Sequence, residues 1–404
     1  MITIDPDRLM GDLRTLAQFG KLGTGVDRTA FSEADMEARR WLLRRMEEAG
    51  LAVRIDGVGN VVGRGTGGGP AVLIGSHTDS VPKGGWLDGS MGVIYGLEIA
   101  RAASESGNGA IIVDVISFED EEGAYKGLLG SASFCGEIGA EEIAGTRNIE
   151  GKSLTDALQA HGLDDVAPER LEKGRYAAYL EAHIEQGPRL EAQAKRIGIV
   201  TGIVGIRRFH IVFDGQADHA GTTPMALRKD AGAAAVIFAA AMLGDFPALA
   251  GEDTVWNIGT VAFQPGAANV VPSRASLIVE FRDTSMAILD TFEAHVAKLA
   301  DDTARDLGVT AAIEPSAAIE PSLLDDALGA HMAAAANEHG ADFMLMPSGA
   351  GHDAMMMARH MPSAMLFVPS ISGRSHDIAE DTDEADIVLG CQVMAKSVER
   401  ILGG

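Results

Sequence analysis

The chain has 404 residues, more than one ordinary hydrophobic core serves, so its length predicts two domains. Hydrophobic residues make up 46% of the chain and charged residues 23%, which is the composition of a globular protein. The formal net charge of -25 argues against nucleic acid and anionic membranes as partners.

Cysteine usage and the N-terminal segment indicate the compartment. Cys135 and Cys391 lie in no CxxC motif and cannot build a disulfide framework, which fits a reducing, cytoplasmic location. The N-terminal segment is charged from its fifth residue and has no apolar signal-peptide region. The longest apolar run, 233–243, is too short to cross a bilayer.

The first half of the chain alternates helical and strand patterns. A helix is predicted from Ser32, where S-x-x-D is a capping pattern, to Gly50. Apolar runs at 71–76 and 111–118 predict buried strands, and metal-capable side chains follow each of them directly. Because sites in open α/β sheets form at the carboxyl ends of strands, these runs predict an α/β fold with a site at that edge.

The stretch 192–314 has a different pattern. Its predicted elements are a strand at 208–213, a long helix after Pro224, strands at 254–263 and 275–281, a helix at 286–307 and a strand at 309–313. This β-α-β-β-α-β order is that of ferredoxin-like domains. Metal-capable residues lie on both sides of it, so we expect 192–314 to be inserted into a metal-binding domain formed by 1–191 and 315–404. In the latter, 363–368 is predicted as a strand and the segment from Asp383 as a closing helix.

Five metal-capable residues from separate stretches stand at strand ends or in glycine-rich turns: His77, Asp88, Glu122, His183 and His376. Imidazole and carboxylate ligands without thiolate suit Zn, Mn, Co or Ni rather than a structural cysteine-rich zinc site. A catalytic zinc typically keeps three protein ligands, so five fit two divalent ions that share one carboxylate.

Two further acidic positions adjoin these ligands. Asp79 is spaced to engage the second nitrogen of His77 or to buttress the site. Glu121 and Glu122 are adjacent and point in different directions, so one can bind metal while the other faces the reacting water. The residues alone leave open which of the two does which. His352 is equally open as a ligand, a substrate contact, a helix cap or a packing residue.

Six strings in the chain resemble one branch of the dinuclear metallohydrolases: HTDSVPKGGWLDGSMG (77–92), DEEG (120–123), HIEQGP (183–188), ADHAGTTPMALRKDA (217–231), NVVP (269–272) and SGAGHDA (348–354). This branch comprises the N-carbamoyl-L-amino-acid hydrolases, β-ureidopropionases and allantoate amidohydrolases of the aminoacylase–carboxypeptidase superfamily. The resemblance runs from about Ser32 to the C-terminus. It implies an exopeptidase-like α/β catalytic domain with an inserted ferredoxin-like domain for dimerisation or as a lid.

The resemblance also implies residue roles. Asp88 becomes the bridging carboxylate, Glu121 the general base and Glu122 a metal ligand. The matching substrate-binding residues are Gln186, Arg207, His219, Asn269 and Arg282. In the family, the histidine and asparagine come from the partner subunit, which implies a homodimer with shared active sites. An arginine fork suits a substrate carboxylate, and a histidine can donate to an oxyanion.

The predicted function is a metal-dependent amidohydrolase that cleaves a linear C–N bond, with a metal-bound hydroxide as nucleophile and a glutamate base. The expected substrate is a small carboxylate-bearing ureido compound, such as an N-carbamoyl amino acid. An aminoacylase or dipeptidase of the same superfamily is the alternative, and an inactive metal-binding protein is a weaker one. Ile206 and the segment EEGAYKGLLGS (121–131) depart from common family patterns, and both lie in or near the region expected to contact the substrate.

Overall fold

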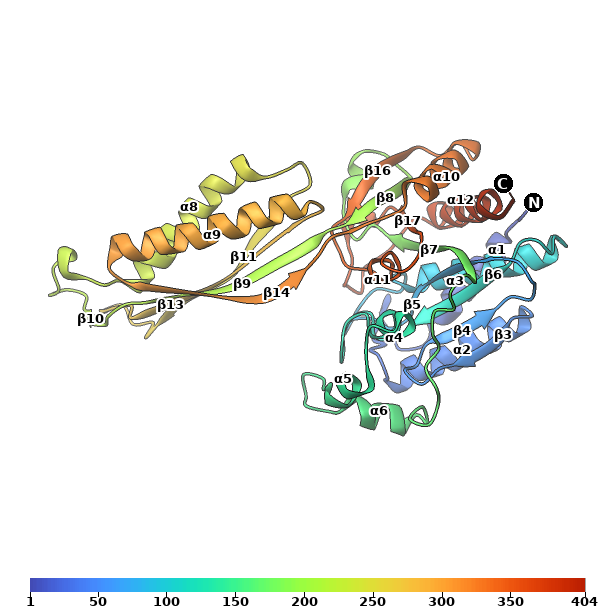
Figure 1. The fold of residues 1–404 in the computed structure, drawn as a ribbon, viewed down its shortest axis with the longest axis horizontal. Helices are drawn as coiled ribbons and strands as arrows, with labels where there is room; N and C mark the ends of the chain where they lie inside the picture. The colour runs from blue at the N-terminus through green and yellow to red at the C-terminus, as the bar shows by residue number, and fades with distance from the viewer. Residues whose placement is uncertain (404) are drawn as a thin grey trace. The chain divides into compact units, whose positions relative to one another are not determined.

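The computed structural model describes residues 1–403, which form two compact units (Figure 1). Unit 1 comprises Met1–Thr201 with Leu323–Gly404, and unit 2 comprises Gly202–Ser322. Both boundaries lie later in the chain than the predicted 192–314. The reason is that strand β8 (Ile197–Ile203) pairs with β17 (Ser363–Val368) in the sheet of unit 1, while β14 (Thr310–Ile319) extends the sheet of unit 2.

Unit 1 is built on a nine-stranded sheet in the order β15-β8-β17-β7-β5-β6-β4-β3, with β16 also paired to β8. Besides β8 and β17, its strands are β3 (Ala52–Ile55), β4 (Val61–Arg64), β5 (Ala71–His77), β6 (Val113–Phe118), β7 (Tyr176–Ile184), β15 (Ser322–Leu323) and β16 (Phe343–Ser348). The central strands β17, β7, β5 and β6 are parallel, and their neighbours β8 and β4 are antiparallel to them. All residues of β5 and β6 are buried, as the apolar runs predict.

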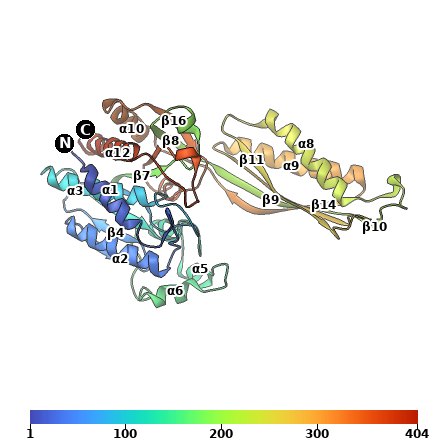
Figure 2. The same ribbon diagram turned by 180° about the vertical axis from the view of Figure 1, so that it is seen from behind.

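One continuous hydrophobic core joins this sheet to five helices: α1 (Pro6–Leu16), α2 (Glu33–Glu48), α3 (Ser90–Glu105), α10 (Asp326–Glu338) and α12 (Glu384–Gly403) (Figure 2). The Ser32 hydroxyl caps α2 by accepting the Asp35 N–H, as the capping pattern predicts. Shorter elements complete unit 1: β1 (Lys21–Leu22), β2 (Gly25–Val26), α4 (Leu129–Cys135), α5 (Ala140–Gly145), α6 (Leu154–Ala160), α7 (Arg189–Ala192), α11 (Asp353–Met357) and the 3₁₀ turn η2 (Ile371–Gly373). The expected mixed α/β architecture is confirmed.

Unit 2 contains the predicted order of two helices and four long strands. They are β9 (Gly205–Asp214), α8 (Ala231–Leu249), β11 (Val255–Gln264), β13 (Arg274–Asp283), α9 (Met286–Leu307) and β14, and the antiparallel sheet has the order β11-β13-β9-β14. A short ladder of β10 (Asp218–His219) and β12 (Val270–Val271) lies outside this sheet. The helix after Pro224 begins later than predicted, because a 3₁₀ turn η1 (Met225–Leu227) intervenes and Asp230 caps α8.

Helix α8 corrects the expectation that no segment is long enough to cross a bilayer. Over Ala231–Leu249 it passes the length and composition test for a membrane span, although the apolar run inside it is shorter. Phe238, Met242 and Phe246 on one face are buried in the core of unit 2. A core helix of a globular domain packs in the same way, so the length and composition of α8 do not by themselves indicate a membrane span.

Candidate metal centre

The parallel strands of unit 1 bring the predicted ligands together. His77 is the last residue of β5, and Glu121 and Glu122 follow β6 after a short turn. His183 lies near the end of β7, and His376 follows β17 on the loop that leads to α12. Because these strands run in one direction, their carboxyl ends meet at one edge of the sheet.

Both buried histidines are oriented by their Nδ1 atoms. Nδ1 of His77 lies 3.0 Å from the carbonyl oxygen of Asp79, and Nδ1 of His183 lies 2.9 Å from that of Ile184. A backbone carbonyl can only accept, so each Nδ1 carries a proton and each Nε2 faces the site, where Nε2 of His183 accepts the backbone N–H of Gly89 at 3.1 Å. The sequence predicted that Asp79 engages this nitrogen of His77 or buttresses the site: its carbonyl oxygen takes the hydrogen bond, and its carboxylate Oδ1 lies 3.6 Å from the same Nδ1.

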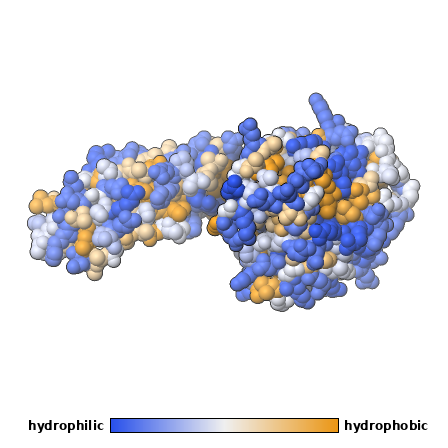
Figure 3. Space-filling view, turned by 90° about the horizontal axis from the view of Figure 1, so that it is seen from below, coloured by the Kyte–Doolittle hydropathy of each residue, from blue (hydrophilic) through white to orange (hydrophobic). Residues whose placement is uncertain are grey.

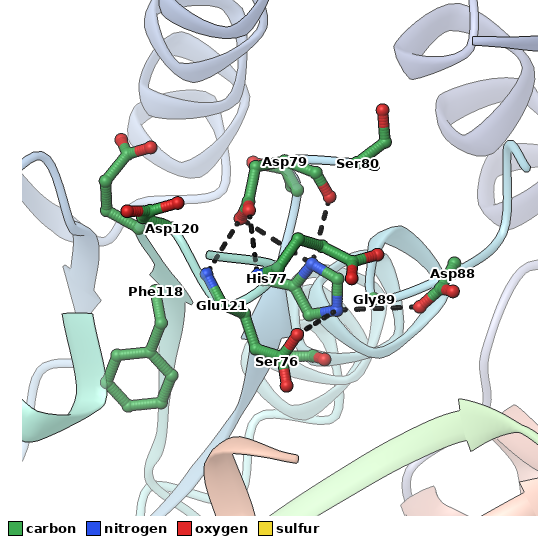
Figure 4. A network of polar contacts seen from close by, with 12 residues as sticks. Ser76, His77, Asp79, Ser80, Asp88, Gly89, Phe118, Asp120 and Glu121 are labelled. Atoms are coloured by element: carbon green, nitrogen blue, oxygen red, sulfur yellow. Dashed lines mark hydrogen bonds and ion pairs between the residues drawn. The ribbon is translucent and has the colours of Figure 1, made fainter. Parts of the chain in front are cut away.

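Asp88 lies close to three histidines, of which Figure 4 shows His77. Its Oδ1 is 3.0 Å from Nε2 of His183 and 3.6 Å from Nε2 of His77, while Oδ2 is 3.3 Å from Nε2 of His376. The backbone beside it must approach closely, because a Cβ on Gly89 would lie 2.4 Å from the His77 ring and Gly89 has a φ of +63°. The two oxygens of the Asp88 carboxylate thus face different imidazoles: Oδ1 faces His183 and His77, and Oδ2 faces His376.

Ligand atoms converge in three overlapping groups, each within 4.8 Å: His77 with Asp88 and His183, Asp88 with Glu122 and His376, and His77 with Glu121 and Glu122. Asp88 belongs to the first two groups, which are made of nitrogen and oxygen donors. Oε1 of Glu122 is buried and has no hydrogen-bond partner among residues 1–403. The donors therefore fit divalent ions, and a shared carboxylate fits two of them.

The two glutamates differ in their neighbours. Oε2 of Glu121 lies 3.7 Å from Nε2 of His77, whereas Oε1 of Glu122 lies 3.5 Å from Nε2 of His376. The Asp79 carboxylate accepts the backbone N–H of both glutamates, at 3.4 and 3.2 Å. Asp79 thus holds the turn that aims the two side chains (Figure 4).

The charges at the site shift its titrations strongly. Burial lowers the pKa of His77, but Glu121, Asp79 and Asp88 outweigh it and hold that pKa well above its usual value. Burial raises the pKa of Asp88, but His183, His376 and His77 outweigh it and hold that pKa well below its usual value. For Glu121, burial dominates and raises the pKa well above its usual value, although His77 opposes it. A raised pKa makes a carboxylate a stronger proton acceptor.

Behind the site lies a buried ionic network that the sequence did not predict. Nε of Arg39, on α2, lies 2.5 Å from Oε2 of Glu119 and 3.0 Å from Oδ1 of Asp35. Its Nη2 lies 3.8 Å from Oδ1 of Asp79. Asp35 lies one turn away on the same helix, but Glu119 and Asp79 come from distant segments, so no sequence pattern links this arginine to the site.

The segment EEGAYKGLLGS, which departs from the common family pattern, folds around the carboxylate of Asp120. No role for Asp120 was predicted from the sequence. Its carboxylate accepts the backbone N–H of Ala124, Tyr125 and Lys126, at 2.6, 2.9 and 2.7 Å. Nζ of Lys126 pairs with Glu142 on α5 at 2.8 Å. The one basic side chain of this segment is therefore engaged away from the ligands.

Gln186 and His352 also lie beside the ligands. Nε2 of Gln186 donates to Oδ2 of Asp88 at 3.0 Å, so the predicted substrate contact touches the candidate bridging carboxylate. The His352 ring packs against that of His183 with centroids 4.5 Å apart, and its Nε2 lies 2.9 Å from Oγ of Ser348. Burial, assisted by His183, lowers the pKa of His352 well below its usual value, so it is a neutral packing neighbour of the ligands.

His219 and Asn269 adjoin each other in unit 2. The backbone N–H of Ala220 donates to the carbonyl oxygen of Asn269, and β10 pairs with β12. Nδ1 of the exposed His219 accepts the N–H of Gly221 and of Thr222, at 3.0 and 3.2 Å. Its proton therefore resides on Nε2, where it can be donated outward.

The two predicted substrate arginines lie on opposite faces of the unit 2 sheet. Arg207 pairs in register with Phe281, and Arg282 pairs with Ile206, so adjacent positions alternate between the faces. Arg207 is buried, with Nε 3.3 Å from Glu293 of α9 and Nη1 3.1 Å from the carbonyl oxygen of Ile319. Nε of the less buried Arg282 donates to Glu280 at 2.8 Å. One carboxylate cannot meet both guanidinium groups.

The family model described as "Peptidase family M20/M25/M40" matches residues 73–400. The chain belongs to this family. The predicted membership in the superfamily is thereby confirmed, and the parallel strand ends that carry the candidate ligands are part of the matched region.

Individual similar proteins within this family are amidohydrolases and amidases. The chain is 35% identical to an N-carbamoyl-L-amino acid amidohydrolase of Geobacillus stearothermophilus over 99% of this chain and 100% of that protein. It is 33% identical to an allantoate amidohydrolase of Bacillus subtilis over 94% and 93% of the two chains. A solved amidase of the hydantoinase/carbamoylase family from Burkholderia phymatum matches with a TM-score of 0.95 and 49% identity, covering 100% of this chain and 99% of that one. The predicted class of enzyme, a hydrolase of C–N bonds in linear amides, is confirmed.

Proposed function

We propose that the protein hydrolyses the ureido group of a small carboxylate-bearing compound, with an N-carbamoyl amino acid as the first candidate. The observation that carries this proposal is the Asp88 carboxylate, whose two oxygens face two separate groups of imidazole and carboxylate donors beside Glu121. Relatives that cleave ureido compounds cover nearly the whole chain, which supports the substrate class.

His77, Asp88 and His183 would hold one divalent ion, and Asp88, Glu122 and His376 the other. Two such ions, Zn, Mn, Co or Ni, supply a Lewis acid for the substrate carbonyl and lower the pKa of a water molecule at the site. Glu121 takes the proton of the attacking water and returns it to the leaving nitrogen. For an N-carbamoyl amino acid, the products are the amino acid, ammonia and carbon dioxide.

The residues of unit 2 are proposed to bind the substrate. The outward Nε2–H of His219 donates to the oxyanion, and Asn269 lies next to the short ladder that carries His219, with its carbonyl oxygen accepting the N–H of Ala220. Arg282 presents a fork to the substrate carboxylate, for which it would exchange its bond to Glu280. Arg207 is held by Glu293 and Ile319, so we assign it to the packing of the unit 2 sheet rather than to the substrate.

Unit 2 is also proposed to be the ferredoxin-like dimerisation domain. Its strand β11 is an edge of the sheet, and Val261 and Phe263 on it are exposed. Ile237 and Leu243 on α8 are exposed as well, and apolar side chains are visible at the surface of this unit in Figure 3. A second copy of the chain would cover both features in a closed twofold assembly and bring His219 to its partner's active site.

A substrate panel tests the reaction. Metal-loaded protein should release ammonia from N-carbamoyl amino acids, lose this activity with a chelator and regain it with a divalent ion. The same protein is given allantoate, N-acyl amino acids and dipeptides. Faster hydrolysis of acyl or peptidyl substrates would assign it to the aminoacylases or dipeptidases, and bound metal without any hydrolysis would make it a binding protein.

A mixed dimer tests the shared site. Glu121→Gln and His219→Ala are each inactive if both residues serve catalysis. In a mixed dimer, one site combines the intact Glu121 of one chain with the intact His219 of the other. Random exchange makes about half of the dimers mixed, so roughly a quarter of all sites should regain activity. No recovery despite proven exchange would show that His219 serves its own chain or none.

A further inference from the structure

A buried glutamate outside the predicted site holds the loop that carries Asp88. Glu380 lies just before α12 and is 1% exposed. Its Oε1 accepts the backbone N–H of Leu87 at 3.1 Å and that of Asp88 at 3.0 Å. One carboxylate oxygen therefore fixes two consecutive peptide groups at the candidate bridging residue.

The Ser375 hydroxyl lies between the second oxygen of Glu380 and the Asp88 side chain, and it can donate its one proton to either carboxylate. Oγ of Ser375 lies 3.0 Å from Oε2 of Glu380 and 3.1 Å from Oδ2 of Asp88. Ser375 directly precedes His376, whose Nε2 lies 3.3 Å from the same Oδ2. The segment that carries one ligand thus sets both the backbone and the side-chain direction of another.

The two loops are shaped for this contact. A Cβ on Gly85 would lie 1.9 Å from the carboxyl carbon of Glu380 and 1.9 Å from its Oε1, so any side chain at position 85 would displace the glutamate. Glycine is needed at position 85 because the Glu380 carboxylate fills the space that a side chain would take.

A purely structural role explains Glu380 less well. Among residues 1–403, no Lys, Arg or His side chain lies within 4.0 Å of its carboxylate, which is instead surrounded by N–H and O–H donors. Burying a carboxylate without a cation costs several kcal/mol unless its hydrogen bonds compensate. The donors of these hydrogen bonds are the backbone N–H groups of Leu87 and Asp88 and the hydroxyl of Ser375.

We propose that Glu380 is a positioning residue for the metal centre. Its hydrogen bonds, with the Ser375 bridge, hold the Asp88 carboxylate so that one oxygen faces His77 and His183 and the other faces His376. Contacts that orient metal ligands typically change metal affinity by 10–100-fold when they are removed. The inference rests on the proposed metal centre and concerns how tightly that centre binds its ions.

The experiment compares metal-free wild-type protein with Glu380→Ala, Glu380→Gln, Ser375→Ala and the control Glu384→Gln. Glu384 lies four residues further on, its side chain is 60% exposed, and it pairs with Arg14 away from the ligands. Zn²⁺ is titrated against a chromophoric chelator, and near-UV circular dichroism and thermal unfolding of each metal-free variant report the fold. Failure of the wild type to bind Zn²⁺ would count against the proposed function itself.

Glu380→Ala should bind Zn²⁺ about 10–100-fold more weakly than wild type, and high Zn²⁺ should restore most of its activity. Glu380→Gln should lose less affinity than Glu380→Ala, because the amide oxygen still accepts both N–H groups. Ser375→Ala should fall between wild type and Glu380→Ala, and Glu384→Gln should match wild type.

Unchanged affinity in Glu380→Ala would overturn the inference. Equal losses in the Gln and Ala variants would also overturn it, because the negative charge and not the direction of the hydrogen bonds would then matter. Should Glu380→Ala fail to fold, Ser375→Ala decides: wild-type affinity in that variant would remove the bridge to Asp88 and with it the proposed positioning.

Discussion

The two units hold their polar side chains in opposite ways. In unit 1, His77, Asp88 and His183 are at most 5% exposed, and every one of them lies within 3.6 Å of another. In unit 2, His219 is exposed and the Arg282 side chain is 29% exposed, with its guanidinium on a neighbouring glutamate. Buried charges must be satisfied by one another, so the first set is preformed. Exposed groups can change partners, so the second set can respond to a substrate or to another subunit.

This contrast separates the kinetic effects expected of each unit. Substitutions in unit 1 should change metal content or kcat, because the side chains act on the ions and the reacting water. Substitutions of Arg282 in unit 2 should change KM, because it binds a part of the substrate that does not react. Any unit 1 ligand that alters KM alone would break the comparison.

The largest effect is expected for Asp88→Ala. This change removes the one carboxylate that belongs to two donor groups, so both ions and all activity should be lost. Metal content by elemental analysis and ammonia release check the outcome, with Glu384→Gln as the matched control. Retention of two ions would show that Asp88 does not bridge.

His376→Ala is expected to lose one ion, and the His77 group should keep the other. The His376 side chain is 50% exposed against 1% for His77, so its ion should also exchange faster in the wild type. Elemental analysis of dialysed protein tests the prediction, with His77→Ala as the comparison, and equal loss of both ions in both variants would contradict it.

The same site should show a distinct pH dependence. A hydrogen bond to Asp88 raises the pKa of His376 to about 9, against the opposing effect of burial. In the metal-free protein this raised pKa contributes stability that is present below about pH 6.5 and is lost as the pH rises through about 9. Because an ion must displace that proton, affinity for the weaker ion should rise by up to about tenfold per pH unit until about pH 9. A flat affinity between pH 7 and 9 would show that the pKa of His376 is not raised.

Glu121→Gln should reduce kcat by about 10²–10⁴-fold while metal content stays near that of the wild type. The amide keeps the size of the side chain but cannot accept a proton. Glu122→Gln is the matched comparison and should lose metal, because its Oε1 faces His376. If Glu122→Gln kept its metal and lost kcat instead, the two roles would be reversed.

The convergence of the candidate ligands could be predicted from sequence because it follows a simple rule. His77 and Glu122 come directly after buried apolar runs, and parallel strands bring such positions to one edge. The boundaries of the insertion could not be predicted, because β8 resembles a strand of either unit until its partner β17 is known. Arg39 and Glu380 were missed for the same reason, since their meaning depends on partners roughly 40 and 290 residues away.

The smallest effect is expected for Arg282→Lys, and it tests the part of the comparison that concerns unit 2. Lysine keeps the charge but loses the planar fork, so one charge-assisted hydrogen bond to the substrate carboxylate should be lost. Such a bond is worth about 1.5–3 kcal/mol, so KM should rise roughly tenfold or more for the carboxylate while kcat and metal content hold. KM for the corresponding amide should be unaffected.

Arg207→Lys is the control for this change, because it makes the same substitution on the opposite face of the same sheet. Its contacts with Glu293 and Ile319 predict a lower unfolding temperature and an unchanged KM. A KM increase in Arg207→Lys and none in Arg282→Lys would assign the substrate carboxylate to the buried arginine. It would also show that unit 2, like unit 1, keeps its functional charge buried, and the contrast between the units would then fail.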